Sequence, residues 1–223
     1  TLITNYDLRW EWFMSPGEVL AVSGFYKDFE KPIETVIDLE SGDGDAITYM
    51  NVPTGQVLGL ELEAKKNLGF ISDAMKYFAV SANLSLINSK VDIPEEEYMV
   101  IQSRDSSASR TRPLFGQSDY IANFDVSYEN PENGFAASLN FNTFGDRLAA
   151  VSYGATPNIY ERSYGTLDFL TTKQFGDHFE LSFSIRNILD PDIVQSQEFK
   201  GKEFVNSSYK IGRAIKFGVK YRL

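Results

Sequence analysis

The sequence predicts an all-β protein, an antiparallel transmembrane β-barrel segment of about nine strands. Apolar and polar residues alternate in nine separate segments, which is the period of a strand with two unlike faces. Short and long connections also alternate along the chain. Aromatic residues make up 14% of the 223 residues, yet the mean hydropathy is only −0.25. No run approaches the roughly 20 apolar residues that a membrane-spanning helix needs.

The nine segments differ in how cleanly they alternate. The first, residues 6–12, reads Tyr-Asp-Leu-Arg-Trp-Glu-Trp without a break. The second, residues 19–27, is less clean, and the seventh, residues 165–172, is the weakest. The other six lie at residues 57–65, 78–86, 120–128, 135–143, 179–186 and 215–223. Their lengths approach the roughly 9–11 residues that a tilted strand needs to cross the hydrocarbon layer. No amphipathic helix is expected between them.

The connections between these segments alternate in length. Short turns are expected at residues 15–17, 67–76, 130–134 and 174–177, and long loops at residues 28–56, 89–118, 145–163 and 190–212. An outer-membrane barrel has short turns on one side and long loops on the other. A soluble β-sandwich with an aromatic core is the alternative. Polar residues at nearly every alternate position favour the barrel, where they face water in the lumen.

The two expected faces of the strands carry different residues. Tyrosines near the strand ends are expected to form the aromatic girdles of a barrel: Tyr6, Tyr26, Tyr77, Tyr120, Tyr128, Tyr164 and Tyr221. Charged residues at the alternate positions are expected to face the lumen and to pair across neighbouring strands: Asp7, Arg9, Glu11, Glu61, Glu63 and Arg186.

The composition excludes several functions. The chain has 21 basic and 31 acidic side chains, a net charge of −10, whereas a nucleic-acid-binding domain needs a basic face. It has no cysteine, which excludes disulfides, thiolate metal sites and cysteine nucleophiles. Its single histidine, His178, lies in an expected turn, so neither a multi-histidine zinc site nor a hydrolase is expected. We expect no enzyme activity and no cofactor.

The two ends of the chain are also informative. The chain opens Thr-Leu-Ile with neither Met nor a signal segment, as expected of a piece of a longer protein. Its last eight residues resemble the C-terminal signal of bacterial outer-membrane barrels, with Lys216, Gly218, Tyr221 and Leu223 at the matching positions. The final Leu stands where Phe or Trp is commoner. This resemblance implies a barrel assembly machinery as partner, because an unpaired terminal strand is a template for β-addition.

Several stretches of the chain resemble one known family. They are residues 5–13 (NYDLRWEWF), 15–18 (SPGE), 24–27 (GFYK), 59–63 (GLELE), 112–118 (RPLFGQS), 144–147 (FGDR) and 186–190 (RNILD). Together they resemble the C-terminal part of TonB-dependent outer-membrane receptors, especially the large receptors of Bacteroidetes-type bacteria. The Asn-Ile-Leu-Asp segment is the most family-specific. Its Asn187 and Asp190 side chains are also expected to cap a turn.

The resemblance implies a 22-stranded barrel with an N-terminal plug and a segment that engages TonB. Residues 1–223 would then be the C-terminal part of the barrel, about its last nine strands, in the outer membrane of a Gram-negative bacterium. The implied partners are membrane lipid, the protein's own plug and N-terminal barrel strands, and the TonB complex through the plug. A surface lipoprotein is a further candidate.

The implied function is active transport of a scarce nutrient such as a ferric chelate, cobalamin, a glycan or a peptide. This chain would supply barrel wall and the extracellular loops that capture the ligand. A small self-contained structural or adhesive barrel is the first alternative, and a soluble β-rich binding module is the second.

One expected loop is rich in acids. Residues 28–56 contain seven carboxylates, and Glu40, Asp43 and Asp45 are close enough in sequence to suggest a calcium site, since Ca²⁺ prefers clustered oxygens. Their spacing does not match an EF-hand. A solvated acidic loop without a metal is therefore the alternative.

A second expected loop, residues 89–118, holds candidate ligand-binding residues. Arg104, Arg110 and Arg112, with Tyr98 nearby, are placed to grip an anionic ligand such as a ferric chelate, because Arg makes bidentate contacts to carboxylates. Pairing of these arginines with loop acids is the alternative. The run Glu-Glu-Glu at residues 95–97 is expected to be a hydrated charge run.

Overall fold

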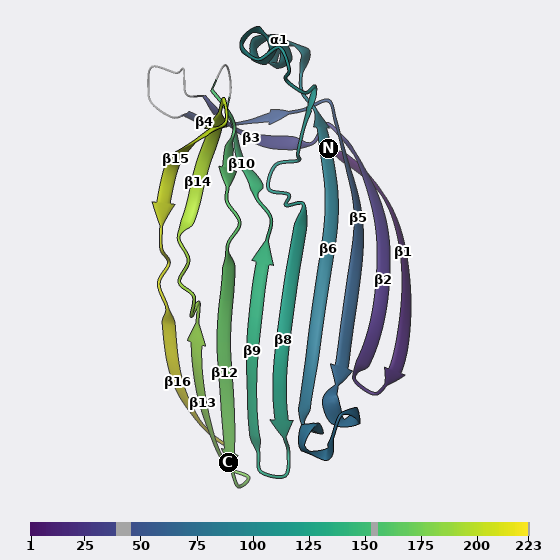
Figure 1. Cartoon of the computed structure of the whole chain (residues 1–223), viewed down its shortest axis with the longest axis vertical. Helices are drawn as coiled ribbons and strands as arrows, with labels where there is room; N and C mark the ends of the chain where they lie inside the picture. The colour runs from purple at the N-terminus through teal and green to yellow at the C-terminus, as the bar shows by residue number, and fades with distance from the viewer. Residues whose placement is uncertain (39–45, 153–155, 223) are drawn as a thin grey trace.

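A curved antiparallel sheet of nine long strands forms the body of the molecule (Figure 1). The structure is a computed structural model that describes residues 1–38, 46–152 and 156–222. Neighbouring strands follow one another in chain order: β1 (Leu2–Ser15), β2 (Glu18–Glu30), β5 (Thr54–Asn67), β6 (Phe78–Asp92), β8 (Tyr120–Asn130), β9 (Phe135–Phe144), β12 (Gly165–Phe175), β13 (Phe179–Arg186) and β16 (Ala214–Tyr221). All nine strands that the sequence predicts are present, so this prediction is confirmed.

The register of the nine strands gives the sheet an apolar face and a polar face. One row of directly opposed residues is apolar across five strands: Trp10, Val22, Leu62, Leu84 and Ala122. The next row, on the other face, is mainly polar: Glu11, Ala21, Glu63, Asn83 and Asn123. On the apolar face Leu8 is 80% exposed and Phe217 81% exposed. A continuous exposed apolar surface of this kind marks contact with a membrane or a partner.

The connections separate the sheet into two unlike ends. The short turns (residues 16–17, 68–77, 131–134 and 176–178) lie at one end, which we call the turn end. One of them contains two single-turn helices, η1 (Leu68–Phe70) and η2 (Asp73–Met75). The long connections (residues 31–53, 93–119, 145–164 and 187–213) lie at the other end, the loop end (Figure 1). The predicted alternation of short and long connections is therefore confirmed.

The long connections are largely folded, where the sequence predicts loops. Six strands form a second sheet in the order β15 (Lys202–Tyr209), β14 (Ile193–Phe199), β11 (Ile159–Glu161), β10 (Arg147–Ser152), β3 (Ile33–Asp38) and β4 (Ala46–Asn51). The second sheet continues part of the wall after a break. Its order β10, β11, β14, β15 runs parallel to the order β9, β12, β13, β16 of the nine-stranded sheet. Figure 1 shows β14 and β15 beyond the ends of β13 and β16.

Two further elements belong to the connection of residues 93–119. Helix α1 (Glu95–Arg104) lies beyond the loop end in Figure 1, and β7 (Thr111–Arg112) pairs with the end of β6. No helix is expected from the sequence here. The three acids in the first turn suit the positive end of the helix dipole. In the described residues, no helix combines the length and the apolar character needed to cross a membrane. We call the second sheet and the connection of residues 93–119, which carries α1 and β7, together the cap.

The best-packed hydrophobic cluster lies in the cap and not in the nine-stranded sheet. Val36, Leu148 and Val151 are almost fully buried, and Met50 and Tyr160 pack against them. Val36 of β3 lies opposite Val151 of β10 in a parallel pairing. Full burial contributes about 1.5–3 kcal/mol for each such side chain. This packing holds the β3–β4 hairpin against the extended wall.

Candidate functional site

A buried arginine joins three elements of the cap, β7, α1 and β3, which come from two separate connections. Arg112 lies on β7, where its backbone pairs with Val91 of β6. Its Nη1 donates to Glu97 Oε1 of α1 at 2.7 Å, and its Nη2 donates to Glu34 Oε2 of β3 at 2.5 Å. The three side chains are 4%, 4% and 0% exposed. This cluster, which we call the arginine clamp, fixes α1 and the β3–β4 hairpin to the end of β6.

The arginine clamp is not electrostatically balanced. Two carboxylates face one guanidinium, and Glu34 Oε1, Glu97 Oε2 and Arg112 Nε are buried without a hydrogen-bond partner. Burial raises the pKa of Glu97 above its ordinary value, because the loss of water outweighs the favourable charge of Arg112. The nearby Glu34 carboxylate adds to this rise. At a given pH, Glu97 in the clamp is therefore protonated in a larger fraction of molecules than an exposed glutamate is.

A second arginine pairs with the same helix turn. Arg110 Nη1 donates to Glu95 Oε2 at 2.7 Å, and its guanidinium lies 4.3 Å from the centre of the Tyr98 ring. Hydrogen bonding to Glu95 raises the pKa of Arg110, so the guanidinium stays charged. The Tyr98 ring is buried, and its hydroxyl donates to the main-chain oxygen of Ala108 at 3.5 Å. Arginine over an aromatic face gains a further cation–π attraction.

The segment that follows Arg112 crosses from β6 to β10. Leu114 N donates to Ser89 Oγ at 3.1 Å, Gly116 N donates to the main-chain oxygen of Leu148 at 2.9 Å, and Ser118 forms a β-bridge with Arg147. Gly116 has a φ of +73°, which an L side chain rarely adopts. Residues 112–118 thus tie the clamp to the hydrophobic cluster of the cap.

The polar face of the nine-stranded sheet carries a ladder of amides. Asn123 Nδ2 donates to Asn83 Oδ1 at 2.6 Å, and Asn142 Nδ2 donates to Asn123 Oδ1, so one amide row crosses β6, β8 and β9. A polar hollow beside it is lined by Ser81, Asp125, Asn140, Thr166 and Asp168 among others. Towards β1, Arg9 donates to Glu63 at 2.7 Å. Arg9 also pairs with Glu11 of its own strand, and its pair with Glu63 reaches across β2, so of the predicted charges these three pair with one another, although not between directly neighbouring strands.

Side-chain caps hold the break between β13 and β14. Asn187 and Asp190 both have positive φ angles, 57° and 48°. Asn187 Nδ2 donates to the main-chain oxygen of Gly212 at 2.9 Å, and Gly212 N donates to Asp190 Oδ1 at 3.1 Å. The expected turn caps are therefore present at these two residues.

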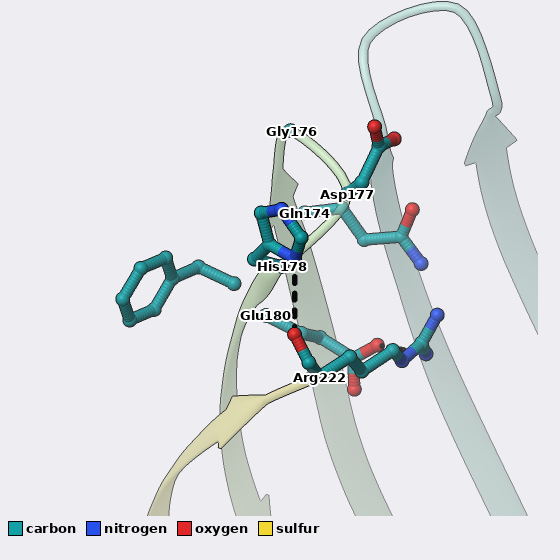
Figure 2. A pocket seen from close by; sticks show the side chains of 7 residues that line it. Gln174, Gly176, Asp177, His178, Glu180 and Arg222 are labelled. Carbon is teal, nitrogen blue, oxygen red and sulfur yellow. Dashed lines mark hydrogen bonds and ion pairs between the residues drawn. The ribbon is translucent and has the colours of Figure 1, made fainter.

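At the turn end, the last strand is fixed to the turn between β12 and β13. Figure 2 shows His178 joined to the end of the chain: its Nδ1 donates to the main-chain oxygen of Arg222 at 3.0 Å. Arg222 Nη2 donates to Glu180 Oε2 at 3.0 Å. The Tyr221 ring packs 5.0 Å from that of Phe179. Polar and aromatic contacts thus both attach the C-terminal end of β16 to the start of β13.

Comparison with known proteins identifies the family. A family model described as TonB dependent receptor-like, beta-barrel matches residues 2–188. The chain belongs to the TonB-dependent receptor β-barrel family. A search of curated proteins found no match.

Solved structures of TonB-dependent receptors share the fold of this receptor barrel. The unliganded ferric citrate transporter FecA is 12% identical, with a TM-score of 0.66 over 99% of this chain and 31% of its own. The copper transporter OprC is 16% identical, with a TM-score of 0.66 over 98% of this chain and 31% of its own. The ferric yersiniabactin uptake receptor FyuA from Yersinia pestis is 17% identical, with a TM-score of 0.64 over 98% and 29%. The chain thus spans less than a third of each of these proteins.

The receptor barrel brings some of the predicted site residues together. Arg110, Arg112 and Tyr98 lie in one region of the cap, while Arg104 is the last residue of α1. Their role in ligand binding stays a prediction. The calcium candidates Glu40, Asp43 and Asp45 lie outside the described residues, as does Leu223 of the C-terminal signal. Across residues 1–38, 46–152 and 156–222, no three acidic or histidine side chains group as metal ligands.

Two residues of the site are missing from the sequence-based prediction. Glu34 and Glu97 complete the arginine clamp, although both belong to segments predicted as hydrated acidic loops. The signal for Glu34 is its alternation with Val36: residues 33–38 read Ile-Glu-Thr-Val-Ile-Asp, and period two places Glu34 on the buried side. No comparable periodicity marks Glu97, since α1 has no apolar stripe.

Proposed function

We propose that this chain supplies barrel wall and extracellular ligand-capturing loops to a TonB-dependent active transporter of the outer membrane. The two unlike faces of the nine-stranded sheet carry the proposal. The apolar face meets lipid, and the polar face lines the interior. The loop end then lies outside the cell and the turn end in the periplasm. Residues 1–223 would all belong to the C-terminal part of the barrel.

The open edges of the sheet support a larger barrel. Strands β1 and β16 are the two edges of the nine-stranded sheet, and they do not pair with each other in the described structure. A membrane barrel has no open edge, because unpaired backbone groups are costly in lipid. Further strands of the same protein would therefore complete the wall. An N-terminal plug would pack against the polar face, and TonB would act on the plug.

The cap supports a role in capturing the nutrient. It gathers Arg110, Arg112 and Tyr98 at the proposed extracellular end. Guanidinium groups favour anionic ligands such as a ferric chelate over a neutral glycan. Cobalamin, glycans and peptides stay within the proposed substrate class. No catalytic role is proposed, in keeping with a family of receptors.

The remaining partners are also proposals. The end of β16, with Lys216, Gly218 and Tyr221, would engage the barrel assembly machinery. A Cβ at position 218 would lie 2.5 Å from Ser182 Oγ, so the glycine leaves room for this hydroxyl between β13 and β16. A surface lipoprotein would bind at the loop end.

Uptake in living cells tests the proposed function. Strains that lack either this protein or TonB are compared with the wild type for uptake of four labelled nutrients: a ferric chelate, cobalamin, an oligosaccharide and a peptide. We expect both deletions to abolish uptake of the same nutrient. Uptake that requires the protein but persists without TonB would contradict the transport mechanism. Recovery of the protein outside the outer membrane would contradict the placement of the sheet.

A further inference from the structure

Two arginines of the cap are paired with two glutamates of α1 at matching spacing. Arg110 pairs with Glu95 and Arg112 pairs with Glu97, each across 15 residues of sequence. The pairs differ in exposure: the first is more than half exposed, and the second is about 4% exposed. One turn of α1 thus places carboxylates on both guanidinium groups.

Other attachments of α1 to the rest of the protein are few. Among the described residues, α1 has no extensive packing interface with any strand. Its apolar side chains Met99 and Val100 are 57% and 41% exposed. The residue that precedes the helix, Pro94, provides no side-chain capping bond. Tyr98 is its one buried aromatic anchor. The two arginine–glutamate contacts and the Tyr98 ring are therefore the side-chain contacts that connect the described part of α1 to residues 108–112.

The two carboxylates that Arg112 binds lie on elements that differ in how firmly they are packed. Glu34 lies on β3, two residues from Val36 of the hydrophobic cluster, so its element is held by packing that does not involve α1. Glu97 lies on the weakly attached helix and leaves one oxygen, Oε2, buried without a partner. Arg112 Nε is also unpaired. A half-satisfied buried network is costly. A ligand with several carboxylates has acceptors both for Nη1 and for the unpaired Nε.

We propose that α1 is an autoinhibitory latch, in which Glu95 and Glu97 occupy the two arginines that an anionic, carboxylate-bearing ligand takes when α1 is released. The inference rests on the proposed function, because it assigns a ligand class and a control step to the same cap. The exchange forms no covalent bond: one carboxylate leaves each guanidinium and another replaces it. Because the two glutamates of α1 and the ligand bind the same arginines, releasing α1 raises the apparent affinity for the ligand.

Amide hydrogen exchange and citrate binding test the latch in the full-length protein purified from outer membranes. Sodium citrate is the probe, and sodium chloride at equal ionic strength controls for screening. Three variants are compared with the wild type: Glu97→Ala, which removes the acceptor for Arg112 Nη1, Glu96→Ala and Arg110→Gln. Glu96 is exposed in the same helix turn and forms no ion pair within the described part of the chain, so its variant is the matched control.

We expect citrate, but not sodium chloride, to accelerate exchange over residues 95–104 in the wild type. Glu97→Ala should show fast exchange without citrate and bind citrate about tenfold more tightly, as expected when about nine-tenths of the molecules were latched. Glu96→Ala should match the wild type, and Arg110→Gln should weaken citrate binding. Citrate binding by Glu97→Ala no tighter than by Glu96→Ala overturns the latch, and so does a helix whose exchange citrate leaves unchanged. Neither readout depends on TonB, so failure of the transport proposal is detected separately.

Discussion

Arg112 and Glu34 are 78 residues apart in the sequence, yet Arg112 Nη2 donates to Glu34 Oε2 at 2.5 Å inside the cap. Their side chains are 4% and 0% exposed. Two charges buried so deeply stabilise a protein only as a pair, because either one alone would be an uncompensated charge out of water. This contact therefore makes the fold of the β3–β4 hairpin depend on the connection that carries α1.

Removal of the guanidinium should destabilise the cap. We expect Arg112→Met to lower the free energy of opening of β10 by about 3–5 kcal/mol, because Glu34 and Glu97 lose their buried partner. Amide hydrogen exchange of residues 147–152 measures this local opening. Arg147→Met is the control, since its ion pair with Glu161 is partly exposed and should contribute about 1 kcal/mol or less. Equal losses in the two variants would contradict a special role for the buried cluster.

The attachment of α1 should weaken as the pH rises. The pKa of Glu97 is higher in the folded cap than in the released segment, so the attached state binds more protons between the two pKa values. This stabilisation of the attached helix is complete below the ordinary glutamate pKa of about 4.3. It is lost as the pH rises through the pKa that Glu97 has in the folded cap. Amide exchange of residues 95–104, corrected for the intrinsic effect of pH, measures this. Glu97→Gln should abolish the dependence and Glu96→Gln should retain it; a dependence that survives Glu97→Gln would assign it to another group.

The nine wall strands are predictable because their two faces differ, one being apolar and the other polar. Period-two alternation is then imposed on nearly every residue, as between Leu84 on the apolar face and Asn83 on the polar face. The short turns and long connections follow from the spacing of these strands along the chain, and an antiparallel order puts them at opposite ends. The family resemblance adds the likeness to a larger receptor barrel, which the family match confirms.

The cap is less predictable because its contacts join distant segments. Strand β10 pairs in parallel with β3, more than a hundred residues earlier, and only two residue pairs define that register. Each strand is short and carries little periodicity of its own. The partners of Arg112 could not be chosen among many loop acids from sequence alone. Glu97 in particular is identical in type to its neighbours Glu95 and Glu96, and only the fold buries it.

Substitution on the two faces of β6 should have opposite consequences. Leu84 lies near the middle of β6 on the apolar face, between Leu62 and Ala122. We expect Leu84→Arg to lower the stability of the barrel by about 2–4 kcal/mol, the cost of a cation near the bilayer midplane. Ser85→Arg is the matched control on the polar face, where the new cation lies opposite Glu61. Urea unfolding in lipid vesicles measures both, and equal tolerance would contradict the assignment of the apolar face to lipid.

The end of β16 should matter for insertion into the outer membrane. Tyr221 packs its ring 5.0 Å from Phe179 and 5.8 Å from His178, and the next residue, Arg222, donates its main-chain N–H to the oxygen of His178 at 2.8 Å. Such aromatic pairs contribute about 0.5–1.5 kcal/mol beyond the area they bury, so Tyr221→Ser should reduce the folded protein in outer membranes about two- to tenfold. Lys220→Ser, which alters the polar face of the same strand, should leave the amount unchanged. Heat-dependent gel mobility separates folded from unfolded barrel and measures both variants. If the two reach the same folded level, Tyr221 carries no assembly information beyond that of its neighbour, and recognition of β16 must depend on other residues.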